Sequence, residues 1–254
     1  MRFQTPLVRA TLIRRYKRFL ADMVLADGTE VTAHCANPGA MTGMAHPGAD
    51  CWLEYVPDPK RKLRWSWRLV ESGGLAVVDT GLANRVVAEA LLQGLPDLPH
   101  DQFRAEVTIT PGTRVDFVLT DRQGDTLVEV KSVTLARNGW SEFPDSVTAR
   151  GTRHLQELTT AAQTGQRAVM LYLLARENPQ RIRIAGDIDP AYAAAFDVAR
   201  AAGVRMIGLG TAITVHGVSA AAPVPLDDLP QAIGASDKTE SHAARPGYGQ
   251  HSKS

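Results

Sequence analysis

Three side chains near the middle of the chain have the types and spacing for one reaction: Asp116, Glu129 and Lys131. Carboxylate oxygens are ligands that suit Mg²⁺ and Mn²⁺, and such an ion polarises a phosphate and lowers the pKa of a bound water. A neighbouring lysine positions that water or stabilises the charge that develops. The set predicts a metal-dependent site for phosphodiester hydrolysis. The alternative is a cross-strand salt bridge on a solvated face of a sheet.

A predicted β-hairpin brings these residues together. Its strands are residues 114–120 and 126–133, which flank a turn-like segment. A pairing that closes this turn places Asp116 opposite Glu129, with Cβ atoms about 5 Å apart. Lys131 shares the face of Glu129 because alternate residues of a strand point the same way. A slip of one residue would send Asp116 to the other face.

The charge of the chain is unevenly spread. The whole sequence carries 28 basic and 27 acidic side chains, a net charge of +1. Residues 1–70 hold 11 of the basic and 6 of the acidic ones, a net of +5, which leaves −4 for the rest. The excess lies in two clusters, residues 14–19 and 60–68, that interleave cations with aromatics. Cations neutralise phosphates and aromatic faces stack on unpaired bases, so both clusters suit single-stranded nucleic acid. The alternative is a solvated strand edge or turn.

The pattern of elements predicts two domains and a tail. Residues 5–80 contain about five short strands and no convincing helix, which indicates a small barrel or sandwich. From Leu82 onwards helices alternate with strands, and residues 168–174 form a continuous apolar run that is typical of a buried central strand. This order predicts a mixed sheet flanked by helices. Residues 231–254 lack apolar periodicity, and we expect them to be disordered.

Composition excludes several classes of protein. With 44% hydrophobic and 22% charged residues, the 254-residue chain is not broadly disordered. It has no run of 18 apolar residues, so no membrane span is expected, and its N-terminus is not typical of a secretory signal. Two cysteines do not make a disulfide scaffold, so we expect a cytoplasmic protein.

The sequence resembles the sugar fermentation stimulation protein family (SfsA) over residues 3–230. The segments that carry the resemblance include LIRRYKRFLA (12–21), VTAHCANPGAM (31–41), RVDFVL (114–119), VEVKSVTL (128–135) and HLQEL (154–158). The resemblance implies a DNA-binding protein with an OB-like β-barrel in residues 1–80 and a restriction-endonuclease-like domain of the PD-(D/E)xK type in residues 81–230. The overall class is then α+β or α/β with two domains.

The resemblance also implies roles for residues. Asp116, Glu129 and Lys131 become the nuclease-type residues. A helix before the hairpin often supplies a further acid in the wider superfamily, and Glu89 matches that place, so the expected ligands of Mg²⁺ or Mn²⁺ are Glu89, Asp116 and Glu129. The alternative for Glu89 is an exposed helix glutamate. The expected nucleic-acid contacts are Arg14, Arg15, Tyr16, Lys17, Arg18, Asn37, Lys60, Arg61, Lys62 and Arg64.

Some questions stay open at this level. The family loop is close to CPNTGSM, whereas residues 35–41 are CANPGAM and lack its hydroxyl groups. His154 and Glu157 could line the same cleft as the carboxylates or form a surface helix pair. The chain could also be a non-catalytic DNA-binding regulator linked to sugar metabolism that keeps the nuclease fold. An RNA partner and a homo-oligomer stay open as well.

Overall fold

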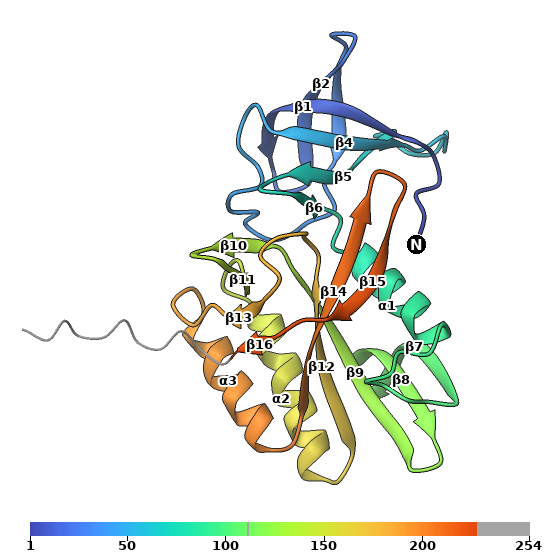
Figure 1. Ribbon diagram of the computed structural model, residues 1–254, viewed down its shortest axis with the longest axis vertical. Helices are drawn as coiled ribbons and strands as arrows, with labels where there is room; N and C mark the ends of the chain where they lie inside the picture. The colour runs from blue at the N-terminus through green and yellow to red at the C-terminus, as the bar shows by residue number, and fades with distance from the viewer. Residues whose placement is uncertain (111, 228–254) are drawn as a thin grey trace, which may run out of the picture.

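The computed structural model describes residues 1–110 and 112–227, arranged as a β-barrel above a larger mixed domain (Figure 1). The barrel strands are β1 (Leu7–Tyr16), β2 (Leu20–Leu25), β3 (Glu30–His34), β4 (Asp50–Tyr55), β5 (Trp65–Glu71) and the short β6 (Leu75–Val77). They follow the order β3-β2-β1-β4-β5-β6, and β3 also pairs with β5, which closes β1–β5 into a barrel. The predicted OB-like barrel is confirmed.

The barrel closes because its apolar residues alternate inward. Leu53 and Trp67 lie on neighbouring strands and are fully buried, as are Cys35 and Cys51. The Trp67 indole donates its N–H to the Leu69 carbonyl at 2.9 Å, which satisfies the polar atom of this large core residue. Part of the second basic cluster is therefore core, because Trp67 of β5 packs in the barrel interior.

The second domain is built on a six-stranded mixed sheet. Its strands are β7 (Gln102–Thr110), β8 (Thr113–Asp121), β9 (Gly124–Val133), β12 (Arg167–Leu174), β14 (Arg205–Thr214) and β15 (Gly217–Pro223), in the order β15-β14-β12-β9-β8-β7. The central pairs β9–β12 and β12–β14 are parallel, and the outer pairs are antiparallel. β12 is buried along nearly its whole length, as its apolar run predicts.

Three helices cover the sheet. α1 (Leu82–Leu92) packs on one face, and α2 (Ala149–Gln163) and α3 (Pro190–Ala201) pack side by side on the other (Figure 1). Thr148 and Asp189 cap the second and third helices by accepting backbone N–H groups of Gly151 and Tyr192. No helix in the described part of the chain is long and apolar enough to cross a membrane.

A second, smaller sheet was not predicted. It contains β10 (Leu135–Arg137), β11 (Trp140–Phe143), β13 (Ile182–Ile184) and β16 (Leu226–Asp227). These strands are two to four residues long, too short for a period-two pattern to stand out from the sequence.

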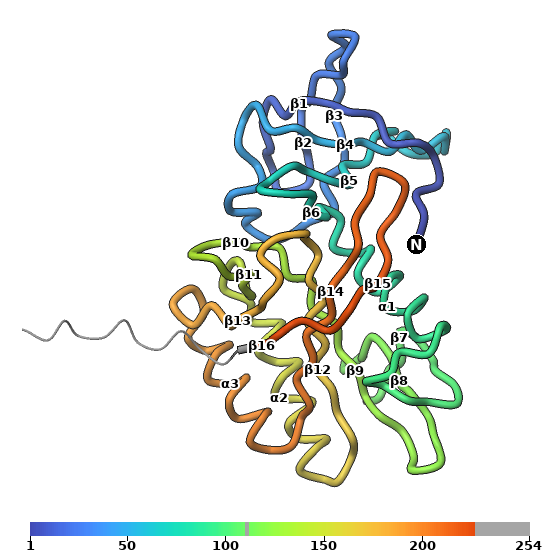
Figure 2. The backbone as a smooth tube through the Cα atoms, viewed as in Figure 1, coloured from blue at the N-terminus to red at the C-terminus, as the bar shows by residue number. Residues whose placement is uncertain are grey.

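The barrel rests directly on the second domain. Figure 2 shows the barrel directly above the second domain, and the loop after β3 contacts the segment that leads into α2. Met41 donates its backbone N–H to the Asp145 carboxylate at 3.0 Å, and Val77 of β6 donates to the Ala175 carbonyl at 2.9 Å. Trp52 and Leu69 of the barrel pack in the same apolar cluster as α1. The loop after β3, which also contacts Arg15, is thereby held against the segment that leads into α2. The predicted disordered tail, residues 231–254, lies outside the described residues.

Candidate active site

The hairpin β8–β9 has the register that the sequence predicts. Thr120 pairs with Asp125, and the ladder continues to Phe117 opposite Val128. Asp116 is the next residue of β8, and there the pairing stops. The predicted carboxylate pair therefore lies where the two strands begin to separate.

Strand β8 changes the direction of its side chains at Asp116. Val115 packs in the core under α2 and α3, whereas Phe117, two residues on, packs in the core under α1. Glu106 of β7 occupies the matching position, between the pairs Ala105–Phe117 and Val107–Val115. Its φ of +56° is a left-handed conformation that glutamate rarely adopts. The irregular backbone at Glu106 in β7 and at Asp116 in β8 directs the Asp116 side chain across the hairpin towards β9.

Two donors hold the Asp116 carboxylate. Its Oδ2 accepts the backbone N–H of Val130 at 2.7 Å, and its Oδ1 accepts the side-chain amide of Asn84 at 2.8 Å. The same amide nitrogen contacts Glu106 Oε1 at 3.3 Å. Asn84 therefore links α1 to β7 through Glu106 and to β8 through Asp116.

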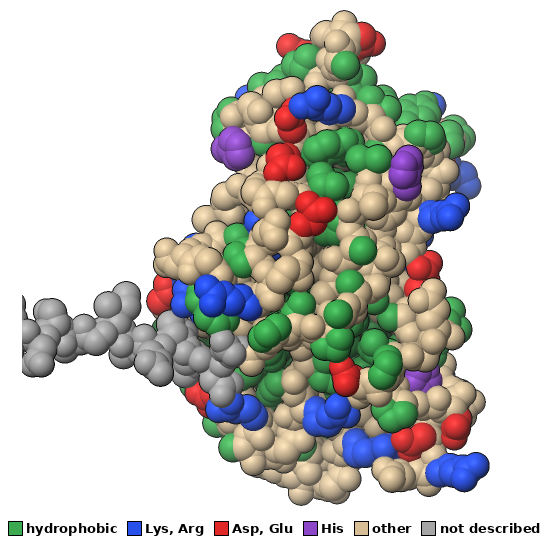
Figure 3. Space-filling view, in the orientation of Figure 1, with side chains coloured by type: hydrophobic (Ala, Val, Ile, Leu, Met, Phe, Trp, Pro, Cys, Tyr) green, Lys and Arg blue, Asp and Glu red, His purple; other side chains and the backbone are tan. Residues whose placement is uncertain are grey.

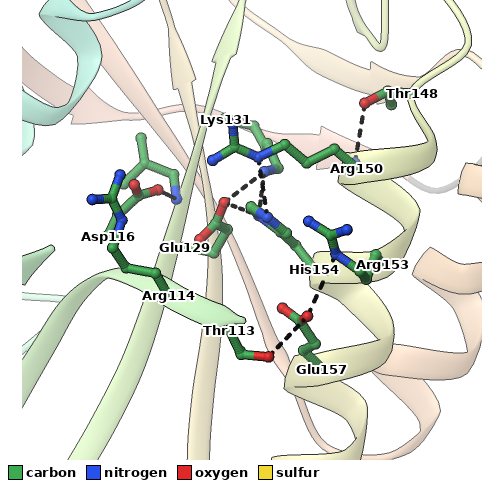
Figure 4. Close-up of polar contacts among 12 residues, drawn as sticks. Thr113, Arg114, Asp116, Glu129, Lys131, Thr148, Arg150, Arg153, His154 and Glu157 are labelled. Atoms are coloured by element: carbon green, nitrogen blue, oxygen red, sulfur yellow. Dashed lines mark hydrogen bonds and ion pairs between the residues drawn. The ribbon is translucent and has the colours of Figure 1, made fainter. Parts of the chain in front are cut away.

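Glu129 lies deeper, among cationic and imidazole groups (Figure 4). The side chain is 4% exposed. Its Oε1 accepts a hydrogen bond from Lys131 Nζ at 2.7 Å and lies in short contact with His154 Nδ1. Lys131 Nζ and His154 Nδ1 are 3.2 Å apart. His154 of α2 thus lies beside the predicted carboxylates, as one of the two interpretations of its helix position predicts.

Their surroundings shift the pKa values of the Asp116 and Glu129 carboxylates in opposite directions. Burial raises the pKa of Asp116, and the negative charge of Glu129 adds to that effect. Burial alone would also raise the pKa of Glu129, but the hydrogen bond with His154 and the charge of Lys131 outweigh it and lower that pKa. A pair of titratable groups pushed in opposite directions is typical of a catalytic site.

The site can take a hard divalent cation with help from solvent or substrate. In residues 1–110 and 112–227, no group of three or more His, Cys, Asp or Glu could hold a metal ion by itself. Mg²⁺ is commonly bound through one or two carboxylates together with waters and substrate phosphates. Asp116 and Glu129 supply those carboxylates; Asp116 is half-buried, and among the described residues it forms no ion pair. The donor set therefore fits such an ion.

The structure does not bring Glu89, a predicted metal ligand, to this site. Its carboxylate forms an ion pair with the N-terminal ammonium of Met1, and its side chain is 48% exposed. Glu89 follows Asn84 by five residues, which turns it about 140° around the helix. The face of α1 beside Asp116 carries Asn84 instead. The sequence analysis considered only acidic residues on this helix and therefore missed Asn84.

Comparisons with known proteins place the chain in a family. Residues 13–78 match the SfsA N-terminal OB domain, and residues 81–217 match the sugar fermentation stimulation protein RE domain. A sugar fermentation stimulation protein homolog of Roseobacter denitrificans is 55% identical over 233 residues, 89% of this chain and 99% of that protein. One of Agrobacterium fabrum is 43% identical over 238 residues, 92% of this chain and all of that protein. The chain belongs to the sugar fermentation stimulation protein family.

A solved member of the SfsA family shares the whole fold. The structure of Pyrococcus furiosus SfsA in complex with Ca²⁺ superimposes with a TM-score of 0.78 at 24% identity, covering 89% of this chain and 98% of that one. The barrel and the mixed sheet therefore keep the SfsA arrangement.

The first basic cluster of the SfsA barrel divides between surface and interior. Lys17 and Arg18 are exposed in the β1–β2 turn, with left-handed φ values of 49° and 62°. Arg14 is exposed but paired with Asp22 at 2.9 Å, and it lies 4.9 Å from the centre of the Tyr16 ring. This turn presents unpaired cations to solvent, whereas Arg14 is already neutralised.

Arg15 and Asn37 build the loop that meets the second domain. Arg15 Nη2 donates to the carbonyls of Asn37 at 2.8 Å and Gly39 at 3.0 Å. The Asn37 side chain is 2% exposed; it donates to the Val78 carbonyl and accepts the Gly39 N–H. The structure therefore uses this predicted nucleic-acid contact to hold the loop, at a position buried from solvent.

The second cluster is likewise mixed. Lys60, Lys62 and Arg64 are exposed, and Arg64 donates to the Tyr55 hydroxyl at 3.1 Å. Arg61 is half-buried and donates to the Ser66 hydroxyl at 3.1 Å. Acidic side chains stand among the basic ones over the barrel face in Figure 3. A run of cations in sequence thus becomes a few separate exposed charges.

Proposed function

We propose that this chain binds nucleic acid, with DNA as the leading candidate substrate. It would hydrolyse the phosphodiester bonds with Mg²⁺ or Mn²⁺ at Asp116, Glu129 and Lys131. The observation that carries the proposal is the convergence of two carboxylates of opposite pKa shift with one lysine at the opened end of a hairpin. The related Pyrococcus furiosus protein was solved with Ca²⁺, which is also an oxygen-seeking cation.

The residues take distinct roles in this proposal. Asp116 and Glu129 would hold the cation, whose chemistry is to polarise the phosphate and lower the pKa of its water. Asn84 orients Asp116 by its 2.8 Å hydrogen bond. Lys131 orients the attacking water or stabilises the developing charge, and the barrel turn with Lys17 and Arg18 supplies phosphate contacts.

A second candidate is a DNA-binding regulator without catalysis. Its support is that Lys131 and His154 already occupy Glu129 Oε1, which leaves that carboxylate partly compensated without a metal. Such a protein would bind DNA in EDTA, and its affinity would fall steeply with salt.

The test is cleavage of single-stranded DNA, duplex DNA, branched DNA and RNA in Mg²⁺ and in Mn²⁺. Lys131→Ala should abolish the metal-dependent products. Arg122→Ala removes a charge at the exposed turn of the same hairpin, away from the cleft, and should leave them unchanged. If wild type and Lys131→Ala give the same products on every substrate, hydrolysis at this site is rejected. DNA binding that persists in EDTA would then favour the regulator.

A further inference from the structure

We infer that Arg150 is a phosphate-binding residue of this cleft and that His154 is its positioning residue. The inference rests on the proposed function, because it assigns two more residues to the same nucleic-acid site. Neither residue is among the acids and lysine that define the predicted nuclease-type set. The argument starts from how the first turn of α2 is built.

The first turn of α2 carries Arg150 to the site, beside His154. Thr148 caps the helix by accepting the Gly151 N–H at 3.1 Å. A Cβ at Gly151 would lie 3.0 Å from Tyr192 Cε2, so glycine lets this turn pack tightly on α3. His154 follows Arg150 by four residues and lies on the same helix face. Figure 4 shows the Arg150 side chain extending from the helix beside Lys131.

Hydrogen-bond chemistry fixes the direction of the contacts around His154. Arg150 Nε lies 3.3 Å from His154 Nε2. A guanidinium group only donates, so Nε2 is the acceptor and Nδ1 carries the proton of the neutral ring. That Nδ1–H points at Glu129 Oε1, which also accepts from Lys131. His154 therefore connects the exposed arginine to the buried carboxylate.

The charges leave Arg150 without a carboxylate partner. Two other arginines at the cleft are paired: Arg114 with Glu106 at 2.8 Å, and Arg153 with Glu157 at 3.6 Å. Among the residues that the structure describes, no carboxylate forms an ion pair with Arg150. Arg150 and Lys131 instead approach opposite nitrogens of one imidazole ring. Lys131 is already paired with Glu129 at 2.7 Å, so Arg150 carries the charge that no carboxylate balances, and an anion at Arg150 would balance it.

Phosphate is the anion that this arrangement suits. Arginine presents a planar fork of donors that matches two phosphate oxygens, whereas lysine acts as a point charge. Arg150 is exposed, whereas the Lys131 side chain beside it is 12% exposed (Figure 4). A phosphate of the bound strand can therefore contact Arg150 from solvent while it approaches Lys131 and the two carboxylates.

The binding test uses labelled single-stranded DNA in EDTA, where hydrolysis plays no part. Affinity is measured over a range of salt for wild type, Arg150→Ala and the matched control Arg153→Ala, whose arginine is already paired. Loss of one phosphate contact should reduce the slope of log K against log salt by about 0.7 for a single strand. The slope of Arg153→Ala should equal that of wild type. Equal slopes for Arg150→Ala and wild type would overturn the inference.

The kinetic test separates binding from positioning. In Mg²⁺ or Mn²⁺, Arg150→Ala should lower kcat/KM about 100-fold if the contact strengthens in the transition state. Arg150→Lys should recover the salt slope and only part of the rate, since its charge is kept without the fork. His154→Asn keeps a donor near Glu129 but cannot reach Arg150, so His154→Asn and Arg150→Ala together should lose no more than Arg150→Ala alone. Additive losses would remove His154 as the positioning residue.

The two proposals fail in different ways. DNA binding without cleavage by wild type rejects the hydrolysis and leaves the Arg150 contact to be decided by the salt slope. Cleavage that Arg150→Ala leaves intact, with an intact slope, rejects only the present inference. No binding by wild type rejects both. Melting temperatures of all variants identify any loss of affinity that comes from unfolding.

Discussion

Asp116, one residue beyond the last pair of the β8–β9 ladder, accepts the backbone N–H of Val130 at 2.7 Å. A side chain here replaces the backbone carbonyl that a continued ladder would supply. The exchange brings the carboxylate beside Glu129, and burial then raises the pKa of Asp116. The fold is less stable for holding this charge, and such a local cost is typical of functional sites.

Replacing Asp116 should stabilise the metal-free protein. A raised pKa means that the folded chain holds this proton more tightly than the unfolded chain does. The contribution of Asp116 therefore falls as pH rises from its ordinary pKa of 3.8 towards the raised value, and it stays low above that. Asp116→Asn removes this loss, so in EDTA at pH 7 its melting temperature should lie above that of wild type.

Asp121 of the same strand provides a control of opposite sign. Its hydrogen bonds with Arg167 hold its pKa below the ordinary value of 3.8. Its contribution to stability is present above pH 3.8 and is lost as pH falls through the lowered pKa. Asp121→Asn should therefore lower the melting temperature at pH 7. An equal response of both variants would show that the pKa of Asp116 is not raised.

Divalent cations should stabilise the wild-type chain through Asp116 and Glu129. A ligand at 100 times its Kd adds about 2.7 kcal/mol when it binds only the folded state. Melting temperatures in EDTA, Mg²⁺, Mn²⁺ and Ca²⁺ measure this effect. Asp116→Asn and Glu129→Gln should lose the metal-dependent rise. Glu89→Gln should keep it, because Glu89 pairs with the Met1 ammonium, and loss of the rise in this variant would restore Glu89 to the metal site.

The hairpin and the central strand were predictable because their patterns are local. Alternating apolar residues and a tight turn fix the pairing of Thr120 with Asp125, and one fixed pair sets the register of the others. The continuous apolar run of β12 likewise admits few positions other than the centre of a sheet. The closed barrel follows from several short strands that share one apolar interior.

The site differs from the prediction where long-range packing decides. The rotation of α1 against the sheet is set by the burial of its apolar face, and it brings Asn84 rather than Glu89 to Asp116. The left-handed Glu106 has no sequence signal, because glutamate seldom adopts that conformation. Whether a cation in a basic run is free, like Lys17, or bonded to a loop, like Arg15, depends on segments far along the chain.

Both cysteines should be inert in the native protein. Burial raises the pKa of Cys35 and raises that of Cys51 to about 12, so almost no thiolate forms at pH 8. Titration with a chromogenic disulfide reagent at pH 8 should detect no rapid thiol in the folded chain and two after unfolding in guanidinium. A fast-reacting thiol in the native protein would contradict the burial of this pair. Exposed-surface variants such as Arg122→Ala serve as the control, because they leave the barrel core untouched.

The β1–β2 turn should carry much of the barrel's affinity for single-stranded nucleic acid. Lys17 and Arg18 are exposed there, and Phe19 beside them is 48% exposed, so charge and a stacking surface adjoin. Lys17→Ala with Arg18→Ala should reduce the salt slope by about 1.4, or about 0.7 for each lost phosphate contact.

Phe19→Ala tests the stacking part of the same turn. It should cost about 1–3 kcal/mol of binding free energy per stacked base, with no change in the salt slope, because it removes a stacking face and no charge. Arg9→Ala is the control for charge, since Arg9 is exposed on β1 but paired with Asp50 at 2.7 Å. Leu92→Ala controls for exposed apolar surface, because Leu92 is 76% exposed on α1. If the turn variants bind as wild type does while Lys60→Ala and Lys62→Ala weaken binding, the nucleic acid follows the second cluster instead.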